Sequence, residues 1–428
     1  MSAAPGVRAG IIVTGTEILS GRTTDRNGPW VSERLEELGL EVGHIVCVGD
    51  RREDLTSALR FLADQGAELI VTTGGLGPTA DDLTAEAVAE FSGRELVLDE
   101  RMEERIAAIL RSFARRLRFD PEALRVANRK QAMVPRGAST IDPAGTAPGL
   151  VVPADGVTVV VLPGPPRELH AMWPEAIASD EVRDVLDRAT PYRFHSLRLF
   201  GIPESEIAKT LRQIQADIDL SPLEITTCLR QAELVVDIRS RPADEELAQR
   251  VSDAVVERHG RFVFSRDGES IDDQVAGLLT DRKVAVAESA TGGLLAARLT
   301  QRRGASAYFA GGVVAYSDEA KDELLGVPSE LIEEHGAVSP EVAEAMADGA
   351  MRRFGADVGC AITGIAGPEG GTDSKPVGYT CFCVKLAGGR QIARDPVLPG
   401  SRADVRDRSV AVAMHLLRVL LRGEEPPL

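Results

Sequence analysis

The sequence is poor in aromatic residues, in paired cysteines and in basic charge. Phe, Trp and Tyr make up only 4% of its 428 residues, so its cores must be built from Ala, Val, Leu and Ile. Its five cysteines are widely spread and form no CxxC pair, which gives no sign of a disulfide framework or a zinc site and favours a reducing cytoplasm. With 66 acidic and 49 basic residues, the formal net charge of −17 argues against nucleic acid as the main partner.

Long apolar runs are also missing. The first apolar run covers only residues 11–13, and no stretch approaches the roughly 18 apolar residues that a membrane span needs. We therefore expect no secretory signal, no membrane partner and a cytoplasmic location.

The length predicts roughly three domains at about 150 residues each. Two outer stretches alternate short apolar strands with amphipathic helices, which predicts parallel sheets covered by helices. We expect α/β domains at residues 1–172 and 266–428, joined by a small α+β domain at residues 173–265. Ligands of parallel α/β sheets bind at the carboxyl ends of the strands, so the turns at those ends are where chemistry is expected.

The expected elements follow from these patterns. In the first domain, strands are predicted at 9–14, 44–48, 68–73 and 157–162, and helices at 30–38, 52–65, 84–90 and 100–118. In the middle domain, strands are predicted at 194–200, 224–229 and 233–239, and helices at 205–213 and 244–258. In the last domain, strands are predicted at 283–287, 311–316, 357–362, 378–385 and 390–397, and helices at 272–281, 294–300, 329–334, 340–354 and 402–421.

Three Gly- or Pro-rich turns follow predicted strands of the first domain, at residues 15–17, 74–82 and 162–168. Glycines in the second turn allow the backbone to approach a ligand and to aim N–H groups at an anion. In the same turn, Thr79 or Asp82 is expected to cap the helix that begins near Thr84. Asp81 and Asp82, with Asp50 after another strand, are suited to a hard cation. Each turn alone is better explained as a plain turn, but three at successive strand ends favour a phosphate-bearing ligand.

The runs TGTEILSGRTTDRN, TTGGLGPTADDLT, ANRKQAMVP, GTAPG and LPGPPREL resemble the molybdopterin-binding fold of the MogA and MoaB proteins, in the variant found in the CinA family. The resemblance covers residues 1 to about 170. It implies a three-layer α/β domain with a site for Mg²⁺ or another divalent cation, held by Asp82 and Asp50, and hydrolysis of ADP-ribose as in some members. The residues implicated are Gly15, Glu17, Asp50, Gly74, Gly75, Gly77, Thr79, Asp81, Asp82, Lys130 and Gly164, with Asn128 and Gln131 as further polar groups. The alternative is molybdopterin at this site, with Asp82 serving adenylyl transfer or cofactor loading.

The last domain carries three motifs at predicted strand ends. Ser289 lies at a strand-to-helix turn, where neighbouring N–H groups form an oxyanion hole in hydrolases; as a plain structural residue it would cap the helix. Lys321 follows another strand, and an enclosed lysine can act as a base because desolvation lowers the pKa of its ammonium. The glycine-rich run 364–371 suits a phosphate cradle. Arg402 and Arg406 lie one helical turn apart and suit a carboxylate or phosphate, although exposed arginines are the commoner case.

The strings AESATGG, YSDEAK and GIAGPEGG, with HGAVSPEV and KPVG, resemble the nicotinamide-nucleotide amidase domain that forms the C-terminal half of CinA proteins, from about residue 270 to 422. The resemblance implies deamidation of nicotinamide mononucleotide, with Ser289 as nucleophile, Lys321 as general base and Tyr316 assisting proton transfer, and without a cofactor. The substrate-binding residues it implies are Glu288, Thr291, Gly292, Thr363, Gly364, Gly367, Gly370, Arg402 and Arg406. The family commonly has Cys where this chain has Ala290; since Ser289 and Lys321 are intact, we expect the site to be active.

The middle domain stands where CinA proteins have a small KH-like domain. A KH domain that binds RNA uses a GxxG loop, and residues 201–204 lack the second glycine. We therefore expect a structural role, in a homodimer interface, and no nucleic-acid partner. The sequence as a whole predicts a bifunctional nucleotide hydrolase; the non-enzymatic alternative is a nucleotide-binding protein linked to DNA uptake or damage.

Overall fold

The computed structural model describes residues 6–114 and 121–425, and the chain divides into two compact units, Met1–Tyr192 and Arg193–Leu428. None of the helices in the described ranges combines the length and apolar character needed to cross a bilayer. The mixed α/β fold expected from the sequence is confirmed in both units.

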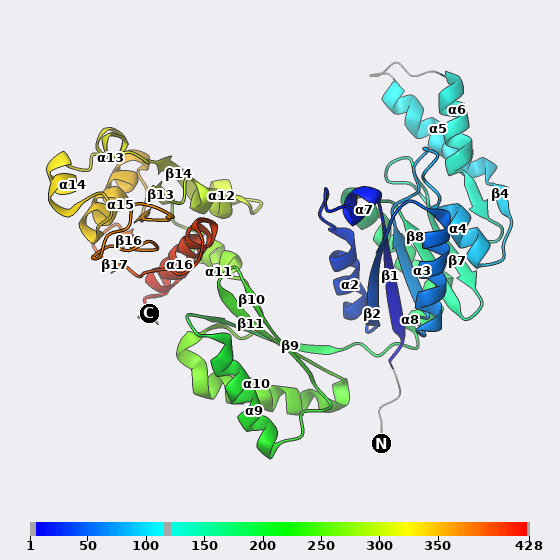
Figure 1. The fold of residues 1–428 in the computed structure, drawn as a ribbon, viewed down its shortest axis with the longest axis horizontal. Coiled ribbons are helices and arrows are strands. Elements are labelled where there is room, and N and C mark those ends of the chain that lie inside the picture. Colours follow the sequence, from blue (N-terminus) through cyan, green and yellow to red (C-terminus); the bar gives the residue numbers. More distant parts are fainter. Residues whose placement is uncertain (1–5, 115–120, 426–428) are drawn as a thin grey trace. The chain divides into compact units, whose positions relative to one another are not determined.

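The first unit is built on a six-stranded sheet (Figure 1). Its strand order is β2 (Glu41–Val48), β1 (Arg8–Thr14), β3 (Leu69–Thr73), β8 (Val157–Leu162), β7 (Gly149–Ala154) and β6 (Ser139–Ile141). The pairs β2–β1, β1–β3 and β3–β8 are parallel, whereas β8–β7 and β7–β6 are antiparallel, so the expected parallel pairing does not extend to this edge. A separate ribbon pairs β4 (Leu96–Leu98) with β5 (Met133–Pro135).

Helices cover both faces of this sheet because neighbouring strand residues point to opposite sides. Ile11 lies in a core shared with α2, α7 and α8, whereas Ile12 lies in a core shared with α3 and α4. The helices are α1 (Thr16–Leu19), α2 (Asn27–Glu37), α3 (Arg52–Asp64), α4 (Thr84–Phe91), α5 (Glu100–Ala114), α6 (Pro121–Gln131), α7 (Pro166–Ala178) and α8 (Asp180–Leu186).

Two expectations for this unit need comment. The helix predicted at 100–118 begins as expected, but its last four residues lie outside the described residues; α6 was not predicted. The domain boundary predicted between residues 172 and 173 lies within α7, whose Met172 and Trp173 pack in the first unit's core.

The second unit begins with a four-stranded antiparallel sheet. Its order is β10 (Glu224–Arg230), β11 (Glu233–Ser240), β9 (Arg193–Phe200) and β12 (Val263–Ser265). Side chains of β9 and β11 share an apolar core with α9 (Glu204–Asp217) and α10 (Glu245–His259). Short 3₁₀ turns lie at Pro242–Asp244 and Gly260–Phe262. This block is α+β, as expected; its likeness to a KH domain stays a prediction.

A five-stranded sheet completes the second unit. Its order is β14 (Phe309–Val314), β13 (Val284–Glu288), β15 (Val358–Gly364), β16 (Thr380–Leu386) and β17 (Gln391–Arg394). The first three strands pair in parallel, and the β15–β16 and β16–β17 pairs are antiparallel. One face carries α11 (Ile271–Leu278), α12 (Leu294–Thr300) and α16 (Arg402–Arg422), and the other carries α13 (Asp318–Leu325), α14 (Ser329–His335) and α15 (Pro340–Phe354). A 3₁₀ turn lies at Ala305–Ala307.

The long helix α16 connects the two sheets of this unit. Its N-terminus is closed by a capping box between Ser401 and Asp404. Farther along, the buried ring of His415 stacks on Phe200 at 3.8 Å between centroids, and its Nε2 lies 3.2 Å from the carboxylate of Glu233. Burial lowers the pKa of His415 despite that carboxylate. The same helix therefore packs on the small sheet with one end and reaches the five-stranded sheet's loops with the other.

Candidate functional sites

In the first unit, a cavity of about 360 Å³ lies at the carboxyl ends of β1, β3 and β8. Because these strands are parallel neighbours, the turns that follow them converge on one edge. The cavity brings together ten of the eleven residues predicted for this site: Gly15, Glu17, Asp50, Gly74, Gly75, Gly77, Thr79, Asp81, Asp82 and Gly164. Lys130 instead lines an adjoining cavity, and its ammonium donates to the carbonyl oxygen of Thr79.

The loop Gly74–Gly77 requires its glycines. Gly74 and Gly75 have φ of 98° and 65°, a region that residues with a Cβ rarely adopt. A Cβ at Gly75 would overlap Thr84 Oγ1, and one at Gly77 would overlap the Asp82 carboxylate. Within the described ranges, no acceptor is recorded for the N–H groups of residues 75–77. These N–H groups are therefore available to a ligand.

The hydroxyl of Thr79 lies between two carboxylates. Its Oγ1 is 2.6 Å from Asp82 Oδ2 and 2.5 Å from Asp81 Oδ1, and hydrogen bonding from Thr79 lowers the pKa of Asp81. One hydroxyl hydrogen cannot serve both acceptors at once, so one carboxylate keeps acceptor capacity. The predicted capping of α4 by Thr79 or Asp82 is wrong, because Leu83 is the N-cap residue and no side chain caps the helix.

The cavity is acidic. Five carboxylates line it, those of Glu17, Asp50, Asp81, Asp82 and Glu168, and its lining contains no Lys, Arg or His. Asp50 Oδ2 accepts from both the N–H and the hydroxyl of Thr16, at 2.8 Å each. A phosphate would meet repulsion here unless a cation accompanied it.

The donor set fits a divalent cation in part. Carboxylate oxygens are the ligands that Mg²⁺ prefers, and Mg²⁺ is usually held by one or two carboxylates together with substrate phosphates. Among the described residues, no group of three His, Cys, Asp or Glu side chains is arranged as a complete metal site. Asp82 and Asp50 are therefore suited to contribute part of a coordination shell that a phosphate-bearing ligand completes.

Sequence reasoning missed Glu168, in the first turn of α7. Its carboxylate lines the cavity, and burial raises its pKa. The signal was present in the sequence, since Glu168 is the last charged residue of the LPGPPREL run. Gln131 also lines the cavity and donates to Leu76 O at 3.0 Å.

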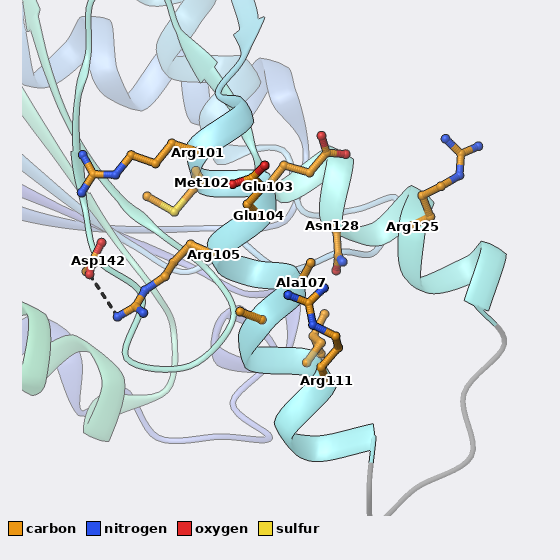
Figure 2. A pocket seen from close by; sticks show the side chains of 12 residues that line it. Arg101, Met102, Glu103, Glu104, Arg105, Ala107, Arg111, Arg125, Asn128 and Asp142 are labelled. Atoms are coloured by element: carbon orange, nitrogen blue, oxygen red, sulfur yellow. Dashed lines mark hydrogen bonds and ion pairs between the residues drawn. The ribbon is translucent and has the colours of Figure 1, made fainter.

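Asn128 lies elsewhere, in a larger hollow of about 1070 Å³ between α5 and α6. Figure 2 shows Asn128 on α6 and the ion pair between Arg105 and Asp142 at the other side of this hollow. None of the eleven residues predicted for the N-terminal site lines it. The larger of the two hollows is therefore not the one lined by the site residues predicted from the sequence.

In the second unit, the three predicted motifs follow β14, β13 and β15, which are parallel neighbours. Ser289 N donates to Ile362 O at 2.9 Å, and Ala315 N donates to Glu288 O at 2.8 Å. The turns that begin at residues 289, 315 and 365 therefore lie at one edge of the sheet.

Ser289 and Lys321 are both buried at this edge, with 8% and 2% of their surface exposed. Lys321 Nζ lies 3.4 Å from Tyr316 O, 3.4 Å from Ser317 O and 3.5 Å from Asp318 Oδ1. These distances exceed those of a good hydrogen bond. In the part of the chain that the structure describes, no hydrogen bond joins Ser289 Oγ to Lys321 Nζ, so the predicted pair is not in direct contact here.

Several residues expected to bind substrate bind the protein's own backbone. The buried carboxylate of Glu288 accepts from the N–H groups of Gly293, Leu295 and Ala296 at 3.0, 3.1 and 2.8 Å. Thr363 Oγ1 donates to Ala337 O at 2.8 Å. Both side chains hold the turns in place.

The two arginines of α16 also hold loops. Arg406 donates to Ala290 O at 3.1 Å and to Thr291 O at 3.0 Å. Arg402 donates to Gly367 O at 2.9 Å and to the hydroxyl of Tyr316 at 2.9 Å. Gly292 lies beside the guanidinium of Arg406. Thr291 Oγ1 is buried and has no hydrogen-bond partner among the described residues.

The remaining predicted glycines lie along the third turn. Gly364 ends β15, and Gly367 is buried against Val377, which a Cβ there would overlap. Gly370 is exposed. This turn is therefore tightly packed near β15 and exposed to solvent at its tip.

Two family models match the chain, one for a probable molybdopterin binding domain at residues 10–183 and one for the CinA C-terminal domain at residues 268–421. A CinA-like protein of Mycobacterium sp. (strain JLS) is 58% identical over 97% of this chain and 99% of its own length. A CinA-like protein of Mycobacterium tuberculosis (strain ATCC 25177 / H37Ra) is 55% identical over 98% and 99%. Among solved structures, the competence/damage inducible protein CihA from Agrobacterium tumefaciens is 37% identical over 35% of this chain and 94% of its own, with a TM-score of 0.34.

Proposed function

This chain belongs to the CinA family, and we propose that its C-terminal α/β domain hydrolyses the carboxamide of nicotinamide mononucleotide to nicotinate mononucleotide and ammonia. Ser289 Oγ attacks the carboxamide carbon while Lys321 Nζ takes the hydroxyl proton as general base. The proton then passes to the departing ammonia, with Tyr316 assisting. Water hydrolyses the resulting acyl-enzyme and releases the acid.

The observation that carries this proposal is the burial of Lys321 at the same strand edge as Ser289. Lys321 has 2% of its surface exposed, and its Nζ lies within 3.5 Å of Tyr316 O, Ser317 O and Asp318 Oδ1, so its amine is enclosed at the edge where Ser289 lies. The lack of a hydrogen bond between Ser289 Oγ and Lys321 Nζ is compatible with catalysis, since catalytic hydrogen bonds often tighten only when substrate is bound.

An oxyanion hole is available beside Ser289. No acceptor is recorded, within the described ranges, for the N–H groups of Ala290 and Thr291. Arg406 holds Ala290 O, and in a trans peptide the N–H of the next residue points the opposite way. Arg406 thus orients the Thr291 N–H away from α16, as a positioning residue for the developing oxyanion.

Ammonia release from nicotinamide mononucleotide by the purified full chain tests this proposal. We expect turnover without added metal and unchanged turnover in EDTA. Absence of ammonia release under both conditions would overturn the amidase assignment. Binding of the nucleotide without ammonia release would favour the non-catalytic alternative, a nucleotide-binding protein linked to DNA uptake or damage.

For the first unit we propose a second activity, divalent-cation-dependent hydrolysis of ADP-ribose to AMP and ribose 5-phosphate. The acidic cavity supports it, because its carboxylates suit Mg²⁺ and its free loop N–H groups suit a pyrophosphate. A bound cation would neutralise phosphate charge and stabilise the leaving oxygen. Asp82 and Asp50 would contribute to holding it, and residues 75–77 would orient the pyrophosphate.

AMP formation from ADP-ribose, with Mg²⁺ and with EDTA, tests the second activity. We expect product only with the cation. Tight binding of molybdopterin without hydrolysis of ADP-ribose would instead favour the cofactor-loading alternative. Sedimentation of the same sample tests the expected homodimer.

A further inference from the structure

A cavity that neither proposed activity uses lies inside the second unit, where the small antiparallel sheet meets the C-terminal half of α16. It encloses about 840 Å³. Its lining comes from the end of β9, from β12 and the turns on either side of it, from α11, and from α16 with the residues that follow it. None of the residues predicted for either functional site lines it. Small-molecule sites occur preferentially where structural blocks meet, so this cavity is a candidate for a ligand of its own.

The most enclosed charge in this cavity is positive. Four arginines and four carboxylates line it, and seven of these eight residues are exposed. The exception is Arg418 on α16, which has 8% of its surface exposed. Its Nε donates to Gln274 Oε1 at 2.9 Å, and no hydrogen bond is recorded for its Nη2 in the part of the chain that the structure describes. A buried guanidinium needs a partner for its charge.

That partner is a carboxylate from just beyond the end of α16. Glu424 Oε2 lies 3.2 Å from Arg418 Nη1, and Glu424 Oε1 lies 3.7 Å from Arg422 Nη1. A carboxylate between two guanidinium groups is the arrangement by which proteins bind carboxylate and phosphate ligands. The side chain of Glu424 is 43% exposed, and an exposed ion pair contributes only about 0–1 kcal/mol. An anion from solution can therefore displace it at small cost.

The backbone at Glu424 is held independently of this ion pair. Its N–H donates to Val419 O at 3.0 Å, and its carbonyl oxygen accepts from Arg390 at 3.1 Å. Displacement of the carboxylate therefore requires rotation of one side chain and no movement of the backbone.

An apolar wall lies beside the two arginines. Phe262 and Val263 line the cavity and are half-buried, so part of their apolar surface stays open. The guanidinium of Arg261 lies over the ring of Phe262, with its central carbon 4.4 Å from the ring centroid. An anion that carries an apolar group would therefore bury that group here and gain affinity over a bare anion.

We propose that this cavity binds a small organic anion. Its phosphate or carboxylate group takes the place of the Glu424 carboxylate between Arg418 and Arg422, and its apolar part packs on Phe262 and Val263. The site is separate from the candidate amidase site, because the sixteen residues of α16 from Arg406 to Arg422 span about 24 Å at about 1.5 Å per residue. The inference depends on neither proposed activity.

Calorimetry on the full chain tests the site with two probes, phenyl phosphate and inorganic phosphate. A Tris buffer stripped of divalent cations keeps the cation-dependent cavity of the first unit from contributing. We expect phenyl phosphate to bind more tightly than inorganic phosphate. Glu424→Gln removes the competing carboxylate and should tighten the binding of both probes about tenfold, whereas Arg422→Gln should weaken it about tenfold.

Glu425→Gln is the matched control. Glu425 lines the same cavity, and no contact with an arginine is recorded for it within the described ranges. The variant removes the same charge and should change both affinities little. Equal tightening in Glu424→Gln and Glu425→Gln would indicate a general effect of net charge and overturn the site.

Three further outcomes would contradict the proposal. Binding of neither probe to wild type or to Glu424→Gln would overturn it. Binding that weakens in Arg406→Lys and not in Arg422→Gln would place the probe at the amidase site and overturn it as well. Equal affinity for phenyl phosphate and inorganic phosphate would overturn the role of the apolar wall.

Discussion

Arg402 donates a hydrogen bond of 2.9 Å to the hydroxyl of Tyr316, although the two residues lie 86 positions apart in the chain. The other nitrogen of the same guanidinium binds Gly367 O. One side chain thus fastens the turn after β14 to the turn after β15. Arg406, one helical turn later, fastens the turn after β13. The first turns of α16 therefore hold all three motifs of the candidate amidase site together.

This arrangement makes the arginines positioning residues in the absence of substrate, and their replacement should show it. Arg406→Lys removes the fork that binds two carbonyl oxygens, because a lysine ammonium cannot reproduce its planar geometry. We expect kcat for ammonia release to fall about tenfold or more, with a smaller change in KM. Arg408→Lys on the same helix, where Arg408 binds Pro399 O, is the control. A rise in KM with unchanged kcat would mean that Arg406 binds substrate instead.

Ser289 and its neighbour Ala290 allow a direct test of the nucleophile. Ser289→Ala should lower ammonia release by at least about 10³-fold while nicotinamide mononucleotide still binds. Lys321→Ala should lower it to a similar extent, because the two act in one step. Retained activity in Ser289→Ala would exclude Ser289 as nucleophile.

Ala290→Cys introduces the residue that CinA proteins commonly carry at this position. We expect the rate of ammonia release to stay nearly unchanged, because the nucleophile is assigned to Ser289. Restoration of activity by this Cys in a Ser289→Ala background would reassign the nucleophile to position 290.

Glu288 should matter for stability as well as for activity. Its carboxylate accepts three backbone N–H groups and is 1% exposed. Glu288→Gln replaces one acceptor oxygen with an NH₂ group that faces a donor, so we expect a loss of about 2 kcal/mol in the free energy of unfolding. Denaturant unfolding measures it. Glu330→Gln, at an exposed first-turn position of α14, should change stability little. A Glu288→Gln variant as stable as wild type would contradict the role of Glu288 in holding the turn after β13.

The carboxyl of Glu168 predicts that the stability of the protein depends on pH. Burial raises the pKa of its carboxyl above the ordinary value of 4.5, so the folded state holds this proton more tightly than the unfolded state. The group therefore favours folding at low pH, and that contribution is lost as the pH rises from about 4.5 through the folded pKa. Glu168→Gln should raise Tm relative to wild type at pH 7 and not at pH 4, while cation-dependent binding of pyrophosphate weakens. The exposed Glu175→Gln on the same helix should show no such difference between the two pH values; an identical Tm change in both variants would contradict the burial argument.

The positions of the site residues were predictable from the sequence because the sequence pattern marks where strands end. A short apolar strand followed by a Gly-rich turn places residues 74–82 and 289–293 at a sheet edge, and parallel pairing makes those edges coincide. Their spacing of four residues placed Arg402 and Arg406 on one face of a helix.

The partners of those residues were not predictable. Glu288, Arg402 and Arg406 carry charges that suit a ligand, yet each binds backbone groups of the turns around it. For the two arginines this choice depends on distances between elements far apart in sequence. The helix α6 was missed because polar and charged residues predominate in its sequence, PEALRVANRKQ. Glu168 was overlooked because its surroundings become enclosing only when α7 packs against residues 145–147.

The five carboxylates of the N-terminal cavity also determine how fast an anionic ligand arrives. The chain carries a net charge of −17, so a nucleotide approaches this opening against a repulsive field with no local basic side chain in the lining to counter it. Dissolved salt screens that field over about 10 Å at 0.1 M. We therefore expect the association rate of an anionic ligand at this cavity to increase with ionic strength, the reverse of the behaviour of proteins that steer their anionic partners with positive charge.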